Sequence, residues 1–147
     1  MIVQNACFIN EDTIVYSCGR HLATLDLISK KMEFIRRDEE HVSEISCLSV
    51  GTSSKKELLI AIGEKMPDGT PRASIFVPNR MRWLYLVHDE EVLPEASRDA
   101  EILRVHLVHE KKYCVTVCKA SAKSNLTVAF WSYNKEKFVK SFTLPRD

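Results

Sequence analysis

Short runs in which apolar and polar residues alternate predict β-strands along most of this chain. In the segment 2–37, the alternation is clear at Leu25 and Leu27 and again at Met32 and Phe34. The turn-forming residues 10–12 and a Gly-Arg step separate the runs from one another. Four strands are therefore expected in this segment, at residues 3–9, 13–17, 21–27 and 31–35.

The same strand-rich pattern returns twice, so the chain divides into three repeats, at about 2–37, 43–88 and 100–145. In each repeat the third run is compact and apolar, whereas the fourth alternates charged with apolar residues. The second and third repeats are expected to hold strands at 45–50, 58–62, 73–77 and 81–87, and at 102–108, 113–118, 126–133 and 138–144.

Two segments need a choice between loop, helix and strand. The segment 66–71 carries two prolines and an Asp-Gly step, which predicts a loop between two strands. Within 94–112, Ala96, Ala100, Leu103 and Leu107 also fit helical spacing. We prefer a loop followed by a strand at 102–108, because the matching part of the other repeats is a strand.

Repeats of this length with four strands each are typical of propeller blades, the four-stranded antiparallel sheets that stand side by side around an axis. The inner strands of a blade are packed on both faces and the outermost strand is half-solvated, which explains the contrast between the third and fourth runs. The expected fold is all-β, one propeller-type segment over 1–147 with three four-stranded antiparallel blades. Three blades do not close a ring, so we expect either part of a larger propeller or a piece completed by a partner chain.

Composition argues against several classes of partner. The chain has 147 residues, with 21 Lys and Arg against 20 Asp and Glu, and a formal charge of +1 creates no field that would attract nucleic acid or an anionic membrane. No apolar run approaches the roughly 20 residues that span a bilayer, and the first residues lack the pattern of a signal peptide. These features predict a cytoplasmic protein without a nucleic-acid, membrane or small-molecule ligand.

The cysteines predict buried thiols rather than a disulfide or metal site. They are odd in number, lie within apolar strand-like runs and form no CxxC pair. Cys114 and Cys118 would lie on one face of a strand about 13 Å apart, too far to share a metal ion. The five are Cys7, Cys18, Cys47, Cys114 and Cys118.

Histidines and glycines do not add a catalytic pattern. His106 and His109 would point to opposite faces of a strand, and the segment 63–69 lacks the order of a phosphate-binding loop. A thiol nucleophile would need Cys114 or Cys18 beside His109 or His21, without an activating context. We therefore expect no catalytic residue, no cofactor and no metal, and a small thiol-dependent enzyme is kept as a remote alternative.

The segment 80–85 is the candidate partner-binding site. It interleaves cations with aromatic residues, as many binding surfaces do, and its members are Arg80, Arg82, Trp83 and Tyr85. An outer edge strand with outward arginines and inward leucine or aromatic side chains explains the same pattern. Acidic runs at 38–40 and 89–91 fall between repeats, where solvated loops are expected.

Three segments carry a resemblance to a known family. The segment 5–35, NACFINEDTIVYSCGRHLATLDLISKKMEFI, resembles the opening blade of the cilia- and flagella-associated WD-repeat proteins found at the base of inner dynein arms. ASIFV at 73–77 and NLTVAFWSYNKEKFVKSFTL at 125–144 resemble strands of the blades that follow. The resemblance implies a partial WD-repeat β-propeller, a non-catalytic interaction scaffold of the cytoskeleton in the ciliary or flagellar axoneme, associated with microtubules and binding other axonemal proteins. A WD-like adaptor of another cytosolic complex is the alternative.

The sequence departs from the WD pattern in its signature dipeptides. No Gly-His opens a repeat, and the third strands end in Phe76-Val77-Pro78 and Phe130-Trp131-Ser132 rather than in Trp-Asp. The Asp-His-Ser/Thr-Trp hydrogen-bond network of standard WD repeats is therefore not expected to assemble, and each blade should rely on apolar packing.

Overall fold

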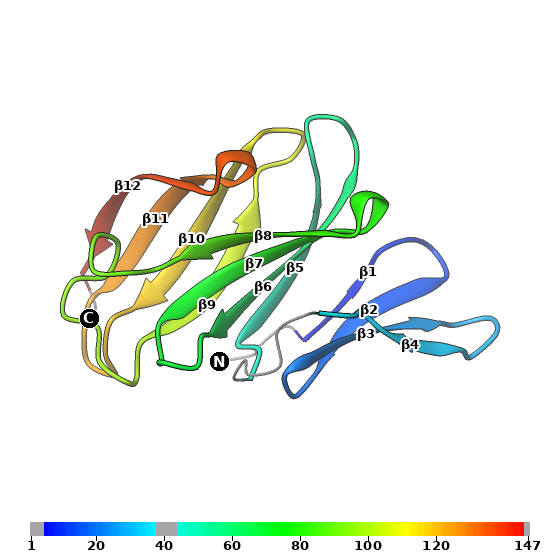
Figure 1. Cartoon of the computed structure of the whole chain (residues 1–147), viewed down its shortest axis with the longest axis horizontal. Coiled ribbons are helices and arrows are strands. Elements are labelled where there is room, and N and C mark those ends of the chain that lie inside the picture. Colours follow the sequence, from blue (N-terminus) through cyan, green and yellow to red (C-terminus); the bar gives the residue numbers. More distant parts are fainter. Residues whose placement is uncertain (1–4, 38–43, 146–147) are drawn as a thin grey trace.

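The three repeats fold into three separate antiparallel sheets of four strands each, as expected (Figure 1). The structure is a computed structural model that describes residues 5–37 and 44–145. Within these residues the strands of every sheet follow one another in chain order from one edge to the other. The first sheet consists of β1 (Ala6–Phe8), β2 (Thr13–Cys18), β3 (His21–Asp26) and β4 (Met32–Phe34).

The second and third sheets are larger than the first, and each carries a short 3₁₀ turn before its last strand. The second sheet consists of β5 (Cys47–Thr52), β6 (Leu58–Lys65), β7 (Pro71–Val77) and β8 (Arg82–Val87), with η1 (Pro78–Arg80) between the last two. The third consists of β9 (Glu101–Leu107), β10 (Tyr113–Lys119), β11 (Leu126–Ser132) and β12 (Lys137–Leu144), with η2 (Tyr133–Lys135) in the same place.

Several expectations about individual segments can be compared directly with these bounds. β9 is a strand preceded by a loop, so the helical alternative for this region is wrong. A loop does separate β6 from β7, but both strands continue further into the segment 63–72 than the sequence predicted. Glu64 and Arg72 lie directly opposite each other on β6 and β7 there. The attraction between their opposite charges stabilises strand pairing in a segment whose polar residues would otherwise favour a loop. The acidic run 38–40 lies outside the described residues.

The second and third sheets pack face to face through the main hydrophobic core. Leu59, Ile75 and Leu86 of the second sheet meet Ile102 and Trp131 of the third. β9 lies against both β5 and β6, because two glycines leave space for it. A Cβ atom on Gly63 would lie 2.7 Å from Cys47 Sγ and 3.0 Å from Ile102 Cβ, and one on Gly51 would lie 2.7 Å from Leu107 Cβ. Glycine therefore sets the distance between these two sheets.

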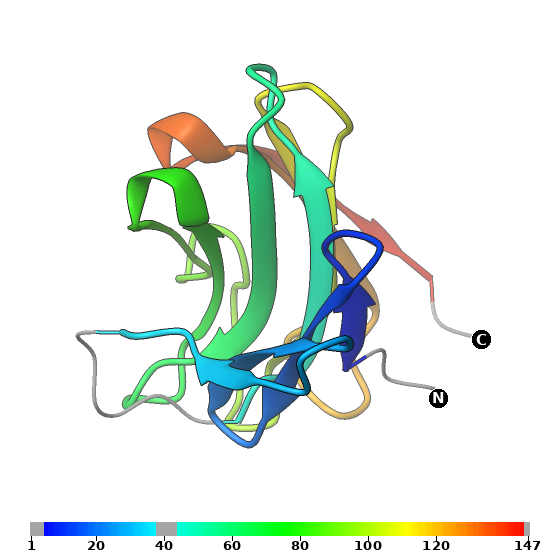
Figure 2. The ribbon, with the colours of Figure 1, turned by 90° about the vertical axis from the view of Figure 1, so that its right-hand side faces the viewer.

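The first sheet packs through a smaller core on the other face of the second sheet. Val15 and Leu22 meet Leu48, Ile60 and Phe76 there. Figure 2 views the molecule from the side of this sheet, whose short strands lie across the end of the second sheet. The second sheet is thus covered on both faces, and all seven residues of β7 are buried. The first and third sheets each leave one face open.

Candidate interaction site

The structure separates the four residues of the candidate partner-binding site onto two faces of the second sheet. Successive side chains of β8 alternate between the faces. Arg82 lies with Leu84 and Arg80 at a groove between the second and third sheets. Trp83 and Tyr85 lie on the opposite face, where Trp83 packs on Phe76 with ring centroids 4.9 Å apart. Partner binding by the four residues stays a prediction, and their placement shows that they do not form one continuous surface.

Trp83 and Tyr85 cover a buried ionic cluster that the sequence did not indicate. The carboxylate of Glu64 accepts hydrogen bonds from Arg37 Nη1 at 2.6 Å and Arg37 Nη2 at 2.7 Å, and from Arg72 Nη2 at 2.9 Å. The Ser74 hydroxyl donates to the same carboxylate. The side chains of Arg37, Arg72 and Glu64 are 7%, 5% and 0% exposed. Arg37 follows the first sheet, so this cluster joins the first sheet to the second.

The aromatic rings complete the cluster. The Arg37 guanidinium lies 4.2 Å from the Trp83 ring centroid, and that of Arg72 lies 4.2 Å from the Tyr85 ring centroid. Burial opposes ionisation of Glu64, but the hydrogen bonds and charge of Arg37, with help from Ser74 and Arg72, hold the pKa of its carboxyl below the usual range. Trp83 and Tyr85 thus stabilise the joint between two sheets.

A second buried polar chain lies between the second and third sheets. His88 follows β8, and its Nδ1 donates to the Leu86 carbonyl at 2.9 Å. Its Nε2 accepts from the Thr116 hydroxyl at 2.8 Å, and Trp131 Nε1 donates to the same hydroxyl oxygen at 3.1 Å. The Leu86 carbonyl, the imidazole, the Thr116 hydroxyl and the Trp131 indole all form these hydrogen bonds only if the imidazole is neutral, with its proton on Nδ1. Burial lowers the pKa of His88 to about 4, in agreement with a neutral ring.

The complete Asp-His-Ser/Thr-Trp network of standard WD repeats is absent among the described residues, as expected, but a histidine, a threonine hydroxyl and a tryptophan do form a shorter version of it. The histidine comes from the end of the second sheet and the threonine and tryptophan from the third, and the sequence has no Gly-His or Trp-Asp dipeptide that marks them. The backbone carbonyl of Leu86 accepts the hydrogen bond in place of an aspartate. The positions of these residues within the repeats could have indicated the network from the sequence. His88 follows the last strand of one sheet, and Thr116 and Trp131 lie on the second and third strands of the next.

The prediction of buried thiols is confirmed for Cys47, Cys114 and Cys118, whereas Cys7 is partly buried and the prediction is wrong for Cys18. Burial raises the pKa of Cys47 to about 11 and that of Cys114 and Cys118 to about 12, which keeps all three protonated and weakly nucleophilic at neutral pH. Cys18 is exposed at the hairpin opposite His21. In the described part of the chain, no group of three or more His, Cys, Asp or Glu side chains is arranged to hold a metal ion.

The groove that contains Arg80 and Arg82 lies at one rim of the interface between the second and third sheets. It encloses about 280 Å³ and is bounded by the loop between β5 and β6, by η1 with β8, and by the loop before β10 with η2. Its apolar floor is buried and its charged wall is exposed to solvent. The lining residues are Ser53, Ser54, Lys55, Glu57, Leu59, Val77, Arg80, Arg82, Leu84, Lys112, Tyr133 and Asn134.

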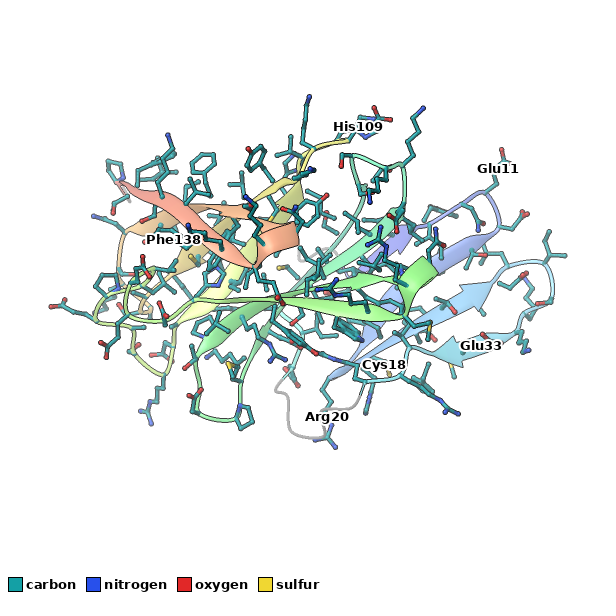
Figure 3. All side chains as sticks on the ribbon, turned by 45° about the horizontal axis from the view of Figure 1, so that its top comes forward. Glu11, Cys18, Arg20, Glu33, His109 and Phe138 are labelled. Carbon is teal, nitrogen blue, oxygen red and sulfur yellow. The ribbon has the colours of Figure 1, made fainter. Side chains whose placement is uncertain are left out.

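Two apolar faces are open at the ends of the row of sheets. On the first sheet Phe8, Met32 and Phe34 are 65%, 48% and 56% exposed. On the third sheet Phe142 and Leu144 are 47% and 40% exposed. Glu11, in the turn between β1 and β2, and Glu33, on the edge strand β4, lie at the margin of the first sheet (Figure 3). Phe138 lies over the third sheet, where its ring packs edge-on against Trp131. Each open face thus exposes large apolar side chains, as surfaces that bind another protein element do.

Solved structures similar to this chain include a β-propeller domain. Neither a protein-family model nor a curated protein matches the sequence. The chain is similar to a chain in the crystal structure of the Mitotic Checkpoint Complex, with a TM-score of 0.51, 8% identity and coverage of 95% of this chain and 50% of that one. It is also similar to the β-propeller domain of the Trilobed protease from Pyrococcus furiosus, described as having an open velcro topology, with a TM-score of 0.51, 9% identity and coverage of 99% and 45%.

These similarities establish the fold class. The chain is a partial β-propeller of three four-stranded blades, and it spans about half the length of the chains that it matches. At 8% and 9% identity the similarity concerns the fold alone. Among the described residues, no helix is long and apolar enough to span a bilayer.

Proposed function

We propose that this chain is a non-catalytic protein–protein interaction scaffold. The observation that carries the proposal is the pair of open apolar faces at the two ends of a well-packed row of blades. The blades hold the connecting loops in fixed positions, and the open faces are covered by further propeller blades, supplied by a partner chain. Covering side chains such as Phe34 and Phe142 stabilises by about 1.5–3 kcal/mol each when burial is complete.

The propeller neighbours and the protonated core thiols both favour a scaffold over a thiol enzyme. A nucleophilic thiol needs a lowered pKa and access to substrate, and Cys114 has neither, because burial raises its pKa. The similarity to propellers in solved structures supports the fold on which interaction scaffolds are built.

The setting that we propose is the ciliary or flagellar axoneme, with other axonemal proteins as partners. The support is the resemblance of segments 5–35, 73–77 and 125–144 to WD-repeat proteins of the inner-dynein-arm base. The test is immunoblotting of purified axonemes and of the detergent-soluble cytoplasm with an antibody to this chain. Enrichment in axonemes supports the assignment. Recovery only in a soluble cytosolic complex favours the alternative adaptor role.

Light scattering coupled to size-exclusion chromatography tests the scaffold itself. Because its end faces are open, the chain is expected to self-associate as its concentration rises. The double variant Met32→Glu/Phe34→Glu, which places charge on one face, should reduce this association. Ile28→Glu is the matched control, since Ile28 is 75% exposed in a turn between β3 and β4. A wild-type chain that stays monomeric and melts cooperatively at all concentrations would contradict the proposal.

A further inference from the structure

The groove between the second and third sheets carries a concentration of positive charge that the whole chain lacks. Four cationic side chains, Lys55, Arg80, Arg82 and Lys112, stand in its lining with a single carboxylate, Glu57. The chain as a whole has a formal charge of only +1. The local excess therefore results from how the fold places these residues, since they come from three separate segments of the chain.

One of the four cationic side chains is neutralised by an ion pair within the fold, and the other three are available to bind a ligand. Arg80 forms a two-pronged pair with Glu57, through Nε at 3.0 Å and Nη2 at 2.7 Å. Lys55, Arg82 and Lys112 are exposed and form no ion pair with any other described residue. Three cations that are not satisfied within the fold at one groove create a potential that attracts an anionic ligand.

The backbone that presents these cations is fixed by hydrogen bonds. The Ser53 hydroxyl accepts from the Lys55 amide at 3.2 Å and from the Glu57 amide at 3.1 Å, which shapes the loop between β5 and β6. The Tyr133 hydroxyl donates to the Lys111 carbonyl at 2.6 Å, and the Tyr133 amide donates to the Lys112 carbonyl at 3.1 Å. A ligand would therefore meet a groove whose walls are already formed, which lowers the entropic cost of binding.

The floor of the groove is apolar. It is formed by Leu59, Val77, Leu84 and Tyr133, all of which are buried. The hydroxyls of Ser53 and Ser54 and the amide of Asn134 add hydrogen-bonding groups to the wall. Because the three available cations stand on three different segments above an apolar floor, the groove suits several anions along a chain with an apolar side chain between them.

We propose that this groove binds an extended acidic segment of a partner protein. Carboxylates of the segment pair with Lys55, Arg82 and Lys112, and an apolar side chain of the segment packs on Leu59 and Leu84. The inference rests on the proposed scaffold function and names the chemistry of one partner. It also assigns Arg82 to binding and Trp83 and Tyr85 to the joint between the first two sheets.

The test is selection of peptides from a phage-displayed library of random 12-residue sequences on the immobilised 147-residue chain. Peptides rich in Asp and Glu that also carry an apolar residue are expected. A synthetic copy of the best peptide, labelled with fluorescein, should bind the double variant Arg82→Gln/Lys112→Gln at least tenfold more weakly by fluorescence anisotropy. Lys135→Gln/Lys137→Gln removes the same charge from exposed positions that do not line the groove, and it should bind as the wild type does.

Two results would overturn the inference. One is a selection that yields no peptides or yields peptides without acidic enrichment, and the other is equal binding of the acidic peptide to wild type and to Arg82→Gln/Lys112→Gln. A copy of the peptide with phosphoserine in place of each glutamate distinguishes the anion. If only the phosphorylated copy binds, the acidic-segment inference is wrong and the partner is a phosphopeptide.

The inference and the scaffold proposal fail separately. Arg82→Gln/Lys112→Gln alters exposed side chains at the groove and leaves the apolar end faces intact. Its concentration-dependent self-association should therefore equal that of the wild type. If the wild type does not self-associate, the scaffold proposal is wrong. If it self-associates but does not bind acidic peptides, only the inference about the groove is wrong.

Discussion

Acidification should weaken the joint between the second and third sheets through a single buried group, His88. The neutral imidazole is hydrogen-bonded to Leu86 and Thr116, and burial lowers its pKa from 6.5 to about 4. In the unfolded chain the same histidine titrates near 6.5. Between these values the unfolded state binds more protons than the folded state, so stability falls as the pH falls.

The size of the effect follows from the two pKa values of His88. The stability is fully present well above pH 6.5 and is lost progressively down to the folded pKa of about 4. With 1.36 kcal/mol per pKa unit, the loss attributable to His88 is about 2 kcal/mol by pH 5 and about 3 kcal/mol by pH 4. Losses of this size are a large part of the stability of a small domain.

Urea unfolding followed by fluorescence of Trp83 and Trp131 between pH 7 and pH 4 measures this effect. Other groups titrate in the same range, so the informative quantity is the difference in unfolding free energy between the wild type and His88→Gln. That difference should shrink by about 3 kcal/mol from pH 7 to pH 4. Parallel curves for the two proteins would refute the reasoning, because they would mean that folding does not change the pKa of His88.

Three further predictions concern particular joints and turns. Glu64→Gln should destabilise by about 3–5 kcal/mol in urea unfolding, because it leaves two buried guanidiniums without their carboxylate, whereas Glu57→Gln, at the surface pair with Arg80, should cost less than about 1 kcal/mol. Gly63→Ala should cost about 1–3 kcal/mol, since its Cβ would lie 2.7 Å from Cys47 Sγ of β5 and 3.0 Å from Ile102 Cβ of β9, and an unchanged melting temperature would contradict this close packing. Lys30→Gly should stabilise by up to about 1 kcal/mol in a thermal melt, because Lys30 has a φ of 63°, while Lys31→Gly, at the next position and without a positive φ, should destabilise.

The strands were predictable because each lies in a short run of apolar and β-branched residues bounded by turn-forming residues, and the fourth run of each repeat also alternates charged with apolar residues. The extension of β6 and β7 was not, since Gly63, Glu64 and Arg72 belong to a turn-rich segment by composition. Two long-range contacts decide the outcome there: Arg37, 27 residues away, neutralises Glu64, and Ile102 fills the space beside Gly63. Local sequence contains neither contact.

The candidate site shows the same limit in a different way. Period-two alternation already places Arg82 and Trp83 on opposite faces of a strand. The edge-strand alternative, with arginines and aromatic residues on different faces, agrees with this placement, but composition does not show that both faces of the second sheet are covered. The groove also needs Lys55 and Lys112, which lie 27 residues before and 30 residues after Arg82 in the sequence and come together only through the packing of two blades.

Arg37 and His88 perform one structural task with different chemistry. Each follows the outermost strand of one sheet and reaches the second strand of the next, Arg37 to Glu64 on β6 and His88 to Thr116 on β10. The charged joint loses its stability only when Glu64 is protonated, which requires a pH below 4.5 because its pKa is lowered. The neutral joint weakens as soon as the pH drops below 6.5, the pKa of His88 in the unfolded chain. Acid should therefore open the second and third blades before the first and second, although the former pair shares the larger core.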